Sequence, residues 1–157
     1  MRTEKSNIYR SESGFTLIEL LTIIGIVGVL ASLSLTSLKV YKSDAGYSVA
    51  EKTLMDARIA LEAGITATES GPDTVPLYVQ KVQGALQNAG ATELLPGMRI
   101  PYNVKFQVEH DNECDMLACQ AELIQVDHCH SNEFIRWVRF GDGSEFQFDN
   151  VAGGDCT

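Results

Sequence analysis

Residues 15–38 read FTLIELLTIIGIVGVLASLSLTSL, the apolar run that decides the fold of this chain. The run contains no Lys, Arg, Asp or Pro, and Glu19 is its single charged residue. An α-helix of this length is about 36 Å long, enough to cross a bilayer core of about 30 Å with some tilt. The sequence therefore predicts a transmembrane helix over residues 15–38.

The flanks of this run predict its orientation. A cleaved secretory signal has an apolar core of about 7–15 residues and a cleavage site of small residues. The run is longer and shows no clear site of that kind at its end, so we expect it to stay in the protein. Arg2, Lys5 and Arg10 precede it and favour a cytoplasmic N-terminus. Everything after Leu38 would then lie outside the cytoplasm.

Glu19 is anomalous in such a setting. A carboxylate inside hydrocarbon costs a few kcal/mol, and ionisable residues there are usually paired and functional. The alternative is that Glu19 lies near the interface in the first turns of a helix, where the positive end of the helix dipole stabilises it. This residue alone leaves both interpretations open.

The segment GFTLIEL at residues 14–20 resembles the class III signal of type IV pilins and type II secretion pseudopilins. The resemblance implies that residues 1–14 are a leader, that a prepilin peptidase cuts after Gly14, and that the new amine of Phe15 is N-methylated. It also implies that Glu19 of an incoming subunit pairs with the Phe15 amine of its neighbour, which would neutralise two charges that are costly to bury alone. The implied partners are the peptidase, which is also the methyltransferase, an inner-membrane assembly platform, and further pilin subunits, identical or different.

The run departs from many members of that family in one respect. They carry a proline in the outer half of the span, where this chain has Thr36. Gly25 and Gly28 are the intrinsically weak helical positions of the span. They serve either as a flexible point or as small residues that allow close approach between helices.

A second helical segment is expected at residues 39–70. Val40, Tyr47, Leu54 and Leu61 recur every seven residues, with Ala50 and Ala57 three places after two of them. This pattern predicts a helix with a narrow apolar seam, continuous with the span and packed on a globular head. We expect a bend at Ala45–Gly46 and an end at residues 69–72. A coiled-coil dimer is the alternative use of the seam.

The remaining sequence predicts a small antiparallel sheet. Residues 71–101 hold all four prolines and read as an αβ connecting region with a short helix over 77–88. Strands are expected at 103–110, 120–128, 134–140 and 145–148, with a tight turn at 141–144. The expected fold is α+β and pilin-like: a long N-terminal helix whose outer half packs on a sheet of three or four strands within residues 102–157, with Trp137 or the Phe residues in the core.

Four cysteines lie in the last third of the chain, at 114, 119, 129 and 156. In an oxidising compartment an even count favours two disulfides, with three possible connectivities. We favour Cys114–Cys119 across the first hairpin and Cys129–Cys156 holding the glycine-rich C-terminal region. The second bond resembles the C-terminal disulfide loop of many type IV pilins.

Charge and motifs narrow the functional classes. The net charge is -9, and it is concentrated after residue 108. An acidic balance without a basic stripe argues against nucleic acid as the primary ligand. His110, His128 and His130 with the cysteines match no standard zinc spacing, and Asp142, Asp149 and Asp155 match no known calcium loop. No catalytic motif is present, so we expect no metal, no cofactor and no enzymatic activity.

The leading hypothesis is a type IV pilin-like structural subunit, stored in the inner membrane as a single-pass protein and polymerised after cleavage into a filament that spans the periplasm or leaves the cell. Adhesion, motility or DNA uptake are roles of such filaments. One alternative is a pseudopilin of type II secretion, or a minor pilin, that primes a short filament. Another is an uncleaved, single-span anchor whose head binds a ligand or metal.

Overall fold

The computed structural model describes residues 14–68, 72–114, 119–131 and 133–151. Its elements are α1 (Leu17–Thr68), β1 (Thr74–Gln80), β2 (Gly84–Ala85), α2 (Ala89–Leu94), β3 (Arg99–Ile100), β4 (Val104–Asp111), β5 (Gln120–His128), β6 (Glu133–Phe140) and β7 (Glu145–Val151). The chain divides after Leu38 into two units, which we describe separately.

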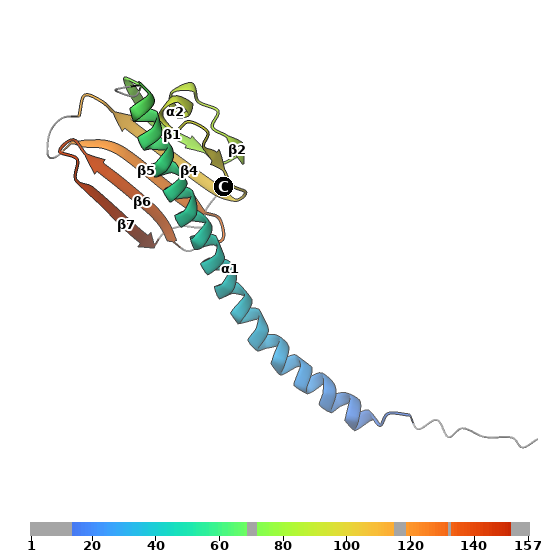
Figure 1. The fold of residues 1–157 in the computed structure, drawn as a ribbon. Coiled ribbons are helices and arrows are strands. Elements are labelled where there is room, and N and C mark those ends of the chain that lie inside the picture. Colours follow the sequence, from blue (N-terminus) through green and yellow to red (C-terminus); the bar gives the residue numbers. More distant parts are fainter. Residues whose placement is uncertain (1–13, 69–71, 115–118, 132, 152–157) are drawn as a thin grey trace, which may run out of the picture. The chain divides into compact units, whose positions relative to one another are not determined.

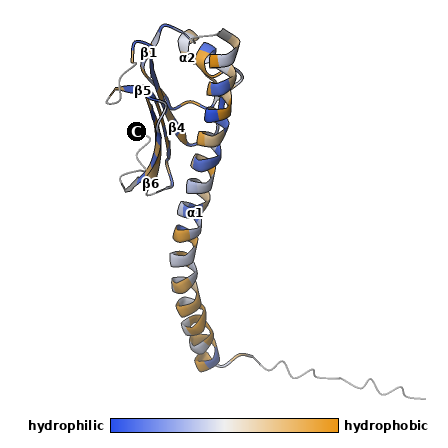
Figure 2. Cartoon of the chain, turned by 60° about the vertical axis from the view of Figure 1, so that its left-hand side comes forward, coloured by the Kyte–Doolittle hydropathy of each residue, from blue (hydrophilic) through white to orange (hydrophobic). Residues whose placement is uncertain are grey.

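The first unit contains the first half of α1, up to Leu38. Every described side chain in it is exposed, and Figure 2 colours this half mostly hydrophobic. Its mean hydropathy reaches 2.3, so by length and composition it can cross a membrane. Its hydroxyl groups donate to backbone carbonyls one turn earlier, as Thr22 does to Ile18 over 2.8 Å and Ser34 to Leu30 over 3.0 Å. Because these hydroxyl groups donate to carbonyls of their own helix, they need no hydrogen-bond partner in the lipid.

The second unit, which we call the head, packs the second half of α1 across one face of a five-stranded antiparallel sheet of order β1-β4-β5-β6-β7 (Figure 1). Along the strands, side chains alternate between the helix-covered face and the outer face. Val104, Phe106 and Val108 of β4 are at most 1% exposed, and they face the helix beside Ile124 and Trp137. The expected α+β architecture is therefore confirmed, and Trp137 and Phe106 are in its core.

The helix contributes small residues and leucines to this core. Ala50, Leu54, Ala57 and Leu61 are all at most 1% exposed. The predicted seam thus packs on the chain's own sheet, so the dimeric coiled coil is not how the seam is used. The prediction that Val40 belongs to this seam is wrong, because its side chain is 58% exposed.

Gly46 has a role other than the expected bend. The helix α1 continues through Ala45–Gly46 without interruption. A Cβ at Gly46 would lie 2.5 Å from Nδ1 of His128 on β5, closer than any real contact. The glycine is therefore required for the close approach of helix and sheet.

The predicted helix over residues 77–88 is wrong. Half of that segment belongs to β1 and β2, and the helix α2 starts directly after the residue where the predicted helix was to end. Asn88 is its N-cap, and its Oδ1 accepts a hydrogen bond from the Ala91 N–H over 3.0 Å. The strand β1 pairs with β4, with an irregularity between Val75 and Tyr78, which flank Pro76. Because β1 is an edge strand, it tolerates this proline, and the sheet gains a fifth strand.

Candidate functional site

The predicted processing site lies directly before α1. Gly14, Phe15 and Thr16 are outside the helix and exposed, and the Phe15 side chain is 80% exposed. A Cβ built on Gly14 meets no atom within 4 Å. The described chain therefore places no steric demand for glycine at this position.

Glu19 takes part in a capping box with Thr16. The Thr16 backbone N–H donates to Glu19 Oε2 over 2.9 Å, and the Thr16 hydroxyl donates to the same oxygen over 2.7 Å. In return, the Glu19 N–H donates to Thr16 Oγ1 over 3.3 Å. This reciprocal pattern satisfies N–H groups that every helix start leaves without partners.

The sequence carries a signal for this capping box, although Thr16 was not among the predicted site residues. A Thr followed three residues later by Glu, before an apolar run, is the standard signature of a capping box. Thr16 is therefore an additional residue of the site. The structure supports the interpretation in which Glu19 stabilises the helix start, and it leaves Glu19 Oε1 without a hydrogen-bond partner among the described residues.

This geometry bears on the pairing that the resemblance implies. Because Glu19 Oε2 bonds the backbone N–H of Thr16, the carboxylate lies one residue away from the nitrogen of Phe15. Cleavage after Gly14 would turn that nitrogen into a cationic amine. The capping box thus holds a carboxylate, with one oxygen unused, near the place where the cation would be generated.

The three described cysteines are disulfide-bonded. Cys114 and Cys119 are joined, with their Cα atoms 5.5 Å apart, and they lie in the connection between β4 and β5. Cys129 is also disulfide-bonded. Cys156, its predicted partner, lies outside the described residues, so that pairing stays a prediction.

The remaining candidate ligands do not assemble into a metal site among the described residues. His110 lies on β4 opposite Glu122, whereas His128 pairs with Val104 at the other end of that strand. Asp142 lies in the β6–β7 turn, where the Ser144 hydroxyl and N–H donate to its carboxylate and lower its pKa. Asp149 lies on β7, and Asp155 is outside the described residues.

A row of charged residues connects the strands to the helix at one end of the sheet. Glu122, Arg139 and Glu145 are neighbours on β5, β6 and β7. The Arg139 guanidinium also bonds Glu62 of α1. Burial opposes the charged form of Arg139, but the hydrogen bond to Glu62 and the surrounding carboxylates raise its pKa overall. This arrangement joins helix and sheet, so we interpret it as structural.

Comparison with known proteins gives one match. Residues 9–35 match the prokaryotic N-terminal methylation motif. No curated protein and no solved structure matches the chain at a significant level. The match contains Gly14, Phe15, Thr16 and Glu19, all the residues of the site described above.

The fold and this motif define a class: a protein with a membrane-anchoring N-terminal helix followed by an antiparallel head. The matched segment is the class III signal of type IV pilins and pseudopilins, and it supports a type IV pilin- or pseudopilin-like protein. The motif points to a structural subunit rather than an enzyme, and it implies processing by a prepilin peptidase.

Proposed function

We propose that this chain is a type IV pilin-like subunit that polymerises into a cell-surface filament after cleavage between Gly14 and Phe15 and N-methylation of Phe15. The observation that carries the proposal is the methylation motif at residues 9–35, placed on an exposed segment that leads directly into an apolar helix. Before cleavage the subunit is stored in the inner membrane with its N-terminus in the cytoplasm.

Glu19 has two roles in this proposal. In the stored subunit it caps α1 through Thr16, which lowers the cost of keeping a carboxylate near hydrocarbon. In the filament its free oxygen accepts the Phe15 amine of a neighbouring subunit, which sets the axial position of each new subunit. The cap need not break for this pairing, because it uses only Oε2.

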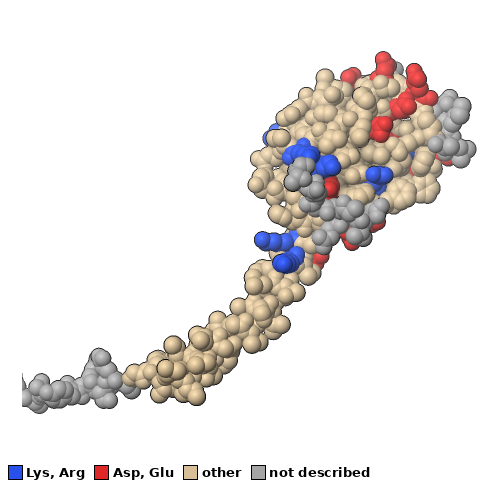
Figure 3. Space-filling model, turned by 180° about the vertical axis from the view of Figure 1, so that it is seen from behind, with Lys and Arg blue, Asp and Glu red and all other residues tan. Residues whose placement is uncertain are grey.

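The two units divide the work. The first half of α1 exposes apolar side chains from Leu17 to Leu38 and packs against no other described element, so we assign it to the filament core. The head remains at the filament surface. Figure 3 shows acidic side chains gathered toward one end of the head on the face in view, which would give the filament an acidic exterior.

The proposal is tested by expressing the full chain with a prepilin peptidase and an assembly machinery in a host that lacks the native subunit. Intact mass should show loss of residues 1–14 and gain of one methyl group. Sheared fibres should contain the processed chain by electron microscopy with a specific antibody. An uncleaved chain that keeps its leader would instead support a single-span anchor.

Variants at the capping box separate the two roles of Glu19. Glu19→Gln keeps the cap, because Gln also serves in capping boxes, but it removes the charge. We expect normal cleavage and a fibre yield at least about tenfold lower, because the partner amine loses its counter-charge. Thr16→Val is the matched control: it loses the cap hydroxyl, keeps the charge, and should still assemble. Normal yield from Glu19→Gln would exclude the salt bridge.

A further inference from the structure

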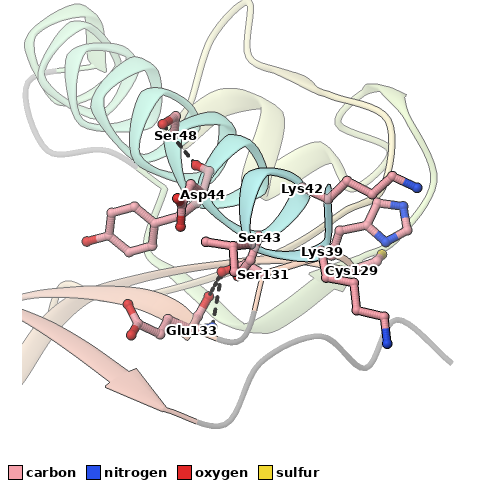
Figure 4. A pocket seen from close by; sticks show the side chains of 11 residues that line it. Lys39, Lys42, Ser43, Asp44, Ser48, Cys129, Ser131 and Glu133 are labelled. Atoms are coloured by element: carbon pink, nitrogen blue, oxygen red, sulfur yellow. Dashed lines mark hydrogen bonds between the residues drawn. The ribbon is translucent and has the colours of Figure 1, made fainter. Parts of the chain in front are cut away.

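The head contains a hollow of about 850 Å³ between the start of its helix and the connection from β5 to β6 (Figure 4). From the helix side it is lined by residues of the 39–48 segment, and from the sheet side by Cys129, His130, Ser131 and Glu133. Its volume falls within the range of about 300–1,000 Å³ that is typical of small-molecule sites. No part of the proposed assembly step uses this hollow.

The charges around the hollow are separated by sign. Figure 4 shows Lys39 and Lys42 on the side of Cys129, and Asp44 and Glu133 on the opposite side. Within the described ranges, none of these four side chains forms an ion pair. The hollow therefore presents two cations facing two anions, and no described residue forms an ion pair with any of them.

The acidic side is held in place by local hydrogen bonds. The Ser131 hydroxyl donates to the Glu133 carbonyl over 2.8 Å and accepts from the Glu133 N–H over 3.1 Å. Ser131 itself is 2% exposed. These bonds fix the backbone of Glu133 where β6 begins, so its side chain starts from a defined position at the edge of the hollow.

The position in the sequence suggests where a ligand would come from. Lys39 directly follows Leu38, the last residue of the apolar run, and Lys42 is one helical turn further on. With a rise of about 1.5 Å per residue, both lie within about 6 Å of the end of the span along the helix. In the membrane-anchored subunit this is the depth of the lipid headgroups.

We propose that the hollow binds the headgroup of phosphatidylethanolamine in the bilayer that stores the subunit. The phosphate lies at Lys39 and Lys42, and the ammonium donates to Asp44 and Glu133. Phosphatidylglycerol offers the phosphate but leaves both carboxylates facing an anion. Phosphatidylcholine has a cation without N–H donors, so it cannot form the charge-assisted hydrogen bonds. The proposal needs only the membrane-anchored state and goes beyond the proposed filament function.

The test uses the full-length chain with its leader, purified in detergent and titrated with defined lipids under native mass spectrometry. We expect phosphatidylethanolamine to bind about tenfold more tightly than phosphatidylglycerol or phosphatidylcholine, as one well-formed charged hydrogen bond allows. Soluble O-phosphoethanolamine is a separate arm. Binding of the soluble compound as tightly as the lipid would show that the membrane is not the source of the ligand and would overturn the proposal.

Three variants assign the two ends of the ligand. The double variant Lys39→Gln/Lys42→Gln should weaken the binding of all three phospholipids about tenfold, because it neutralises two lysines near the headgroup. Glu133→Gln should weaken phosphatidylethanolamine alone and remove its preference over phosphatidylglycerol. Lys52→Gln is the matched control, because Lys52 lies on the same helix, has a 76% exposed side chain and does not line the hollow.

Two results would reject the site. If Lys52→Gln weakens lipid binding as much as the double variant does, lipid binding depends on general surface charge and not on the hollow. If Glu133→Gln leaves the preference for phosphatidylethanolamine unchanged, the acidic side of the hollow plays no part. All substituted side chains are at least partly exposed, so folding should be kept, and unchanged near-ultraviolet circular dichroism checks this. Cleavage and fibre yield are measured separately, so failure here leaves the filament proposal standing.

Discussion

The two halves of α1 have the same secondary structure and opposite surroundings. Gly25 and Gly28 in the first half meet no atom within 4 Å of a built Cβ. In the second half, the same construction at Gly64 meets the Leu94 carbonyl oxygen at 2.2 Å. Glycine in the second half is therefore required by the packing of the subunit itself. In the first half, whatever requires it must come from outside the chain, either lipid or other helices.

The largest expected effect on stability comes from substituting a glycine in the second half of α1. Gly64→Val would drive two methyl groups into the backbone of α2, where Leu94 cannot move as a flexible side chain would. We expect the head to lose about 3 kcal/mol of unfolding free energy, the upper part of the range for overpacked cores. This loss is measured by thermal unfolding of the full chain in detergent, monitored by near-ultraviolet circular dichroism.

The same substitution in the first half is the control. Gly25→Val and Gly28→Val have open space around the new side chain, so the unfolding of the head should not change by more than about 0.5 kcal/mol. Their effect, if any, should appear in fibre yield. A loss of head stability from either variant would contradict the division between the two halves.

A smaller effect is expected from the Cys114–Cys119 bond. It closes a short loop, with a sequence separation of 5, so the loop-entropy relation gives about 2 kcal/mol. Cys114→Ser/Cys119→Ser should lower the unfolding midpoint of the head and leave the helical content of the first half unchanged. An unchanged midpoint would show that other contacts already restrict this loop in the unfolded chain.

The smallest effect concerns pH. Burial, followed by the charge of His130, lowers the pKa of His128, which packs against Gly46. The unfolded chain therefore takes up the proton first as the pH falls. The stability linked to His128 is complete above about pH 6.5, the ordinary histidine value, and is lost as the pH falls below it toward the folded pKa.

Unfolding midpoints at pH 7.5 and pH 5.5 measure this effect. The difference between the two midpoints should shrink in His128→Gln, whatever that variant does to stability at pH 7.5. If the difference is the same in the variant and in the native chain, other groups account for the pH dependence.

The sequence predicted those features that depend on periodicity. Leu54 and Leu61 recur at helical spacing, and the alternation of Val104, Phe106 and Val108 is that of a half-buried strand. The turn at residues 141–144 was also predicted, and Gly143 adopts the positive φ of +82° that such turns require.

The sequence could not predict features that depend on distant partners. Residues 74–80 form a strand because β4 offers them an edge, and no local pattern around Pro76 indicates that edge. Gly46 looked like a bend because its actual requirement, the ring of His128, is far away in the sequence. The hollow near Lys39 likewise combines segments almost a hundred residues apart, so only the folded chain reveals it. Thr16 is different, because its signal was local and could have been read.

The environment of Trp137 makes its fluorescence a probe of how the helix packs on the sheet in the head. Trp137 is the single tryptophan of the chain and is 1% exposed. The guanidinium groups of Arg58 on α1 and Arg139 on β6 each lie over its ring, at 5.0 and 5.1 Å from the ring centre. Its indole N–H donates to Glu145 on β7 over 3.3 Å. Any event that separates helix from sheet therefore changes the emission of one fluorophore. Because the first half of α1 holds no tryptophan, tryptophan fluorescence can follow the head alone in membranes, in detergent and in any fibre that the chain forms.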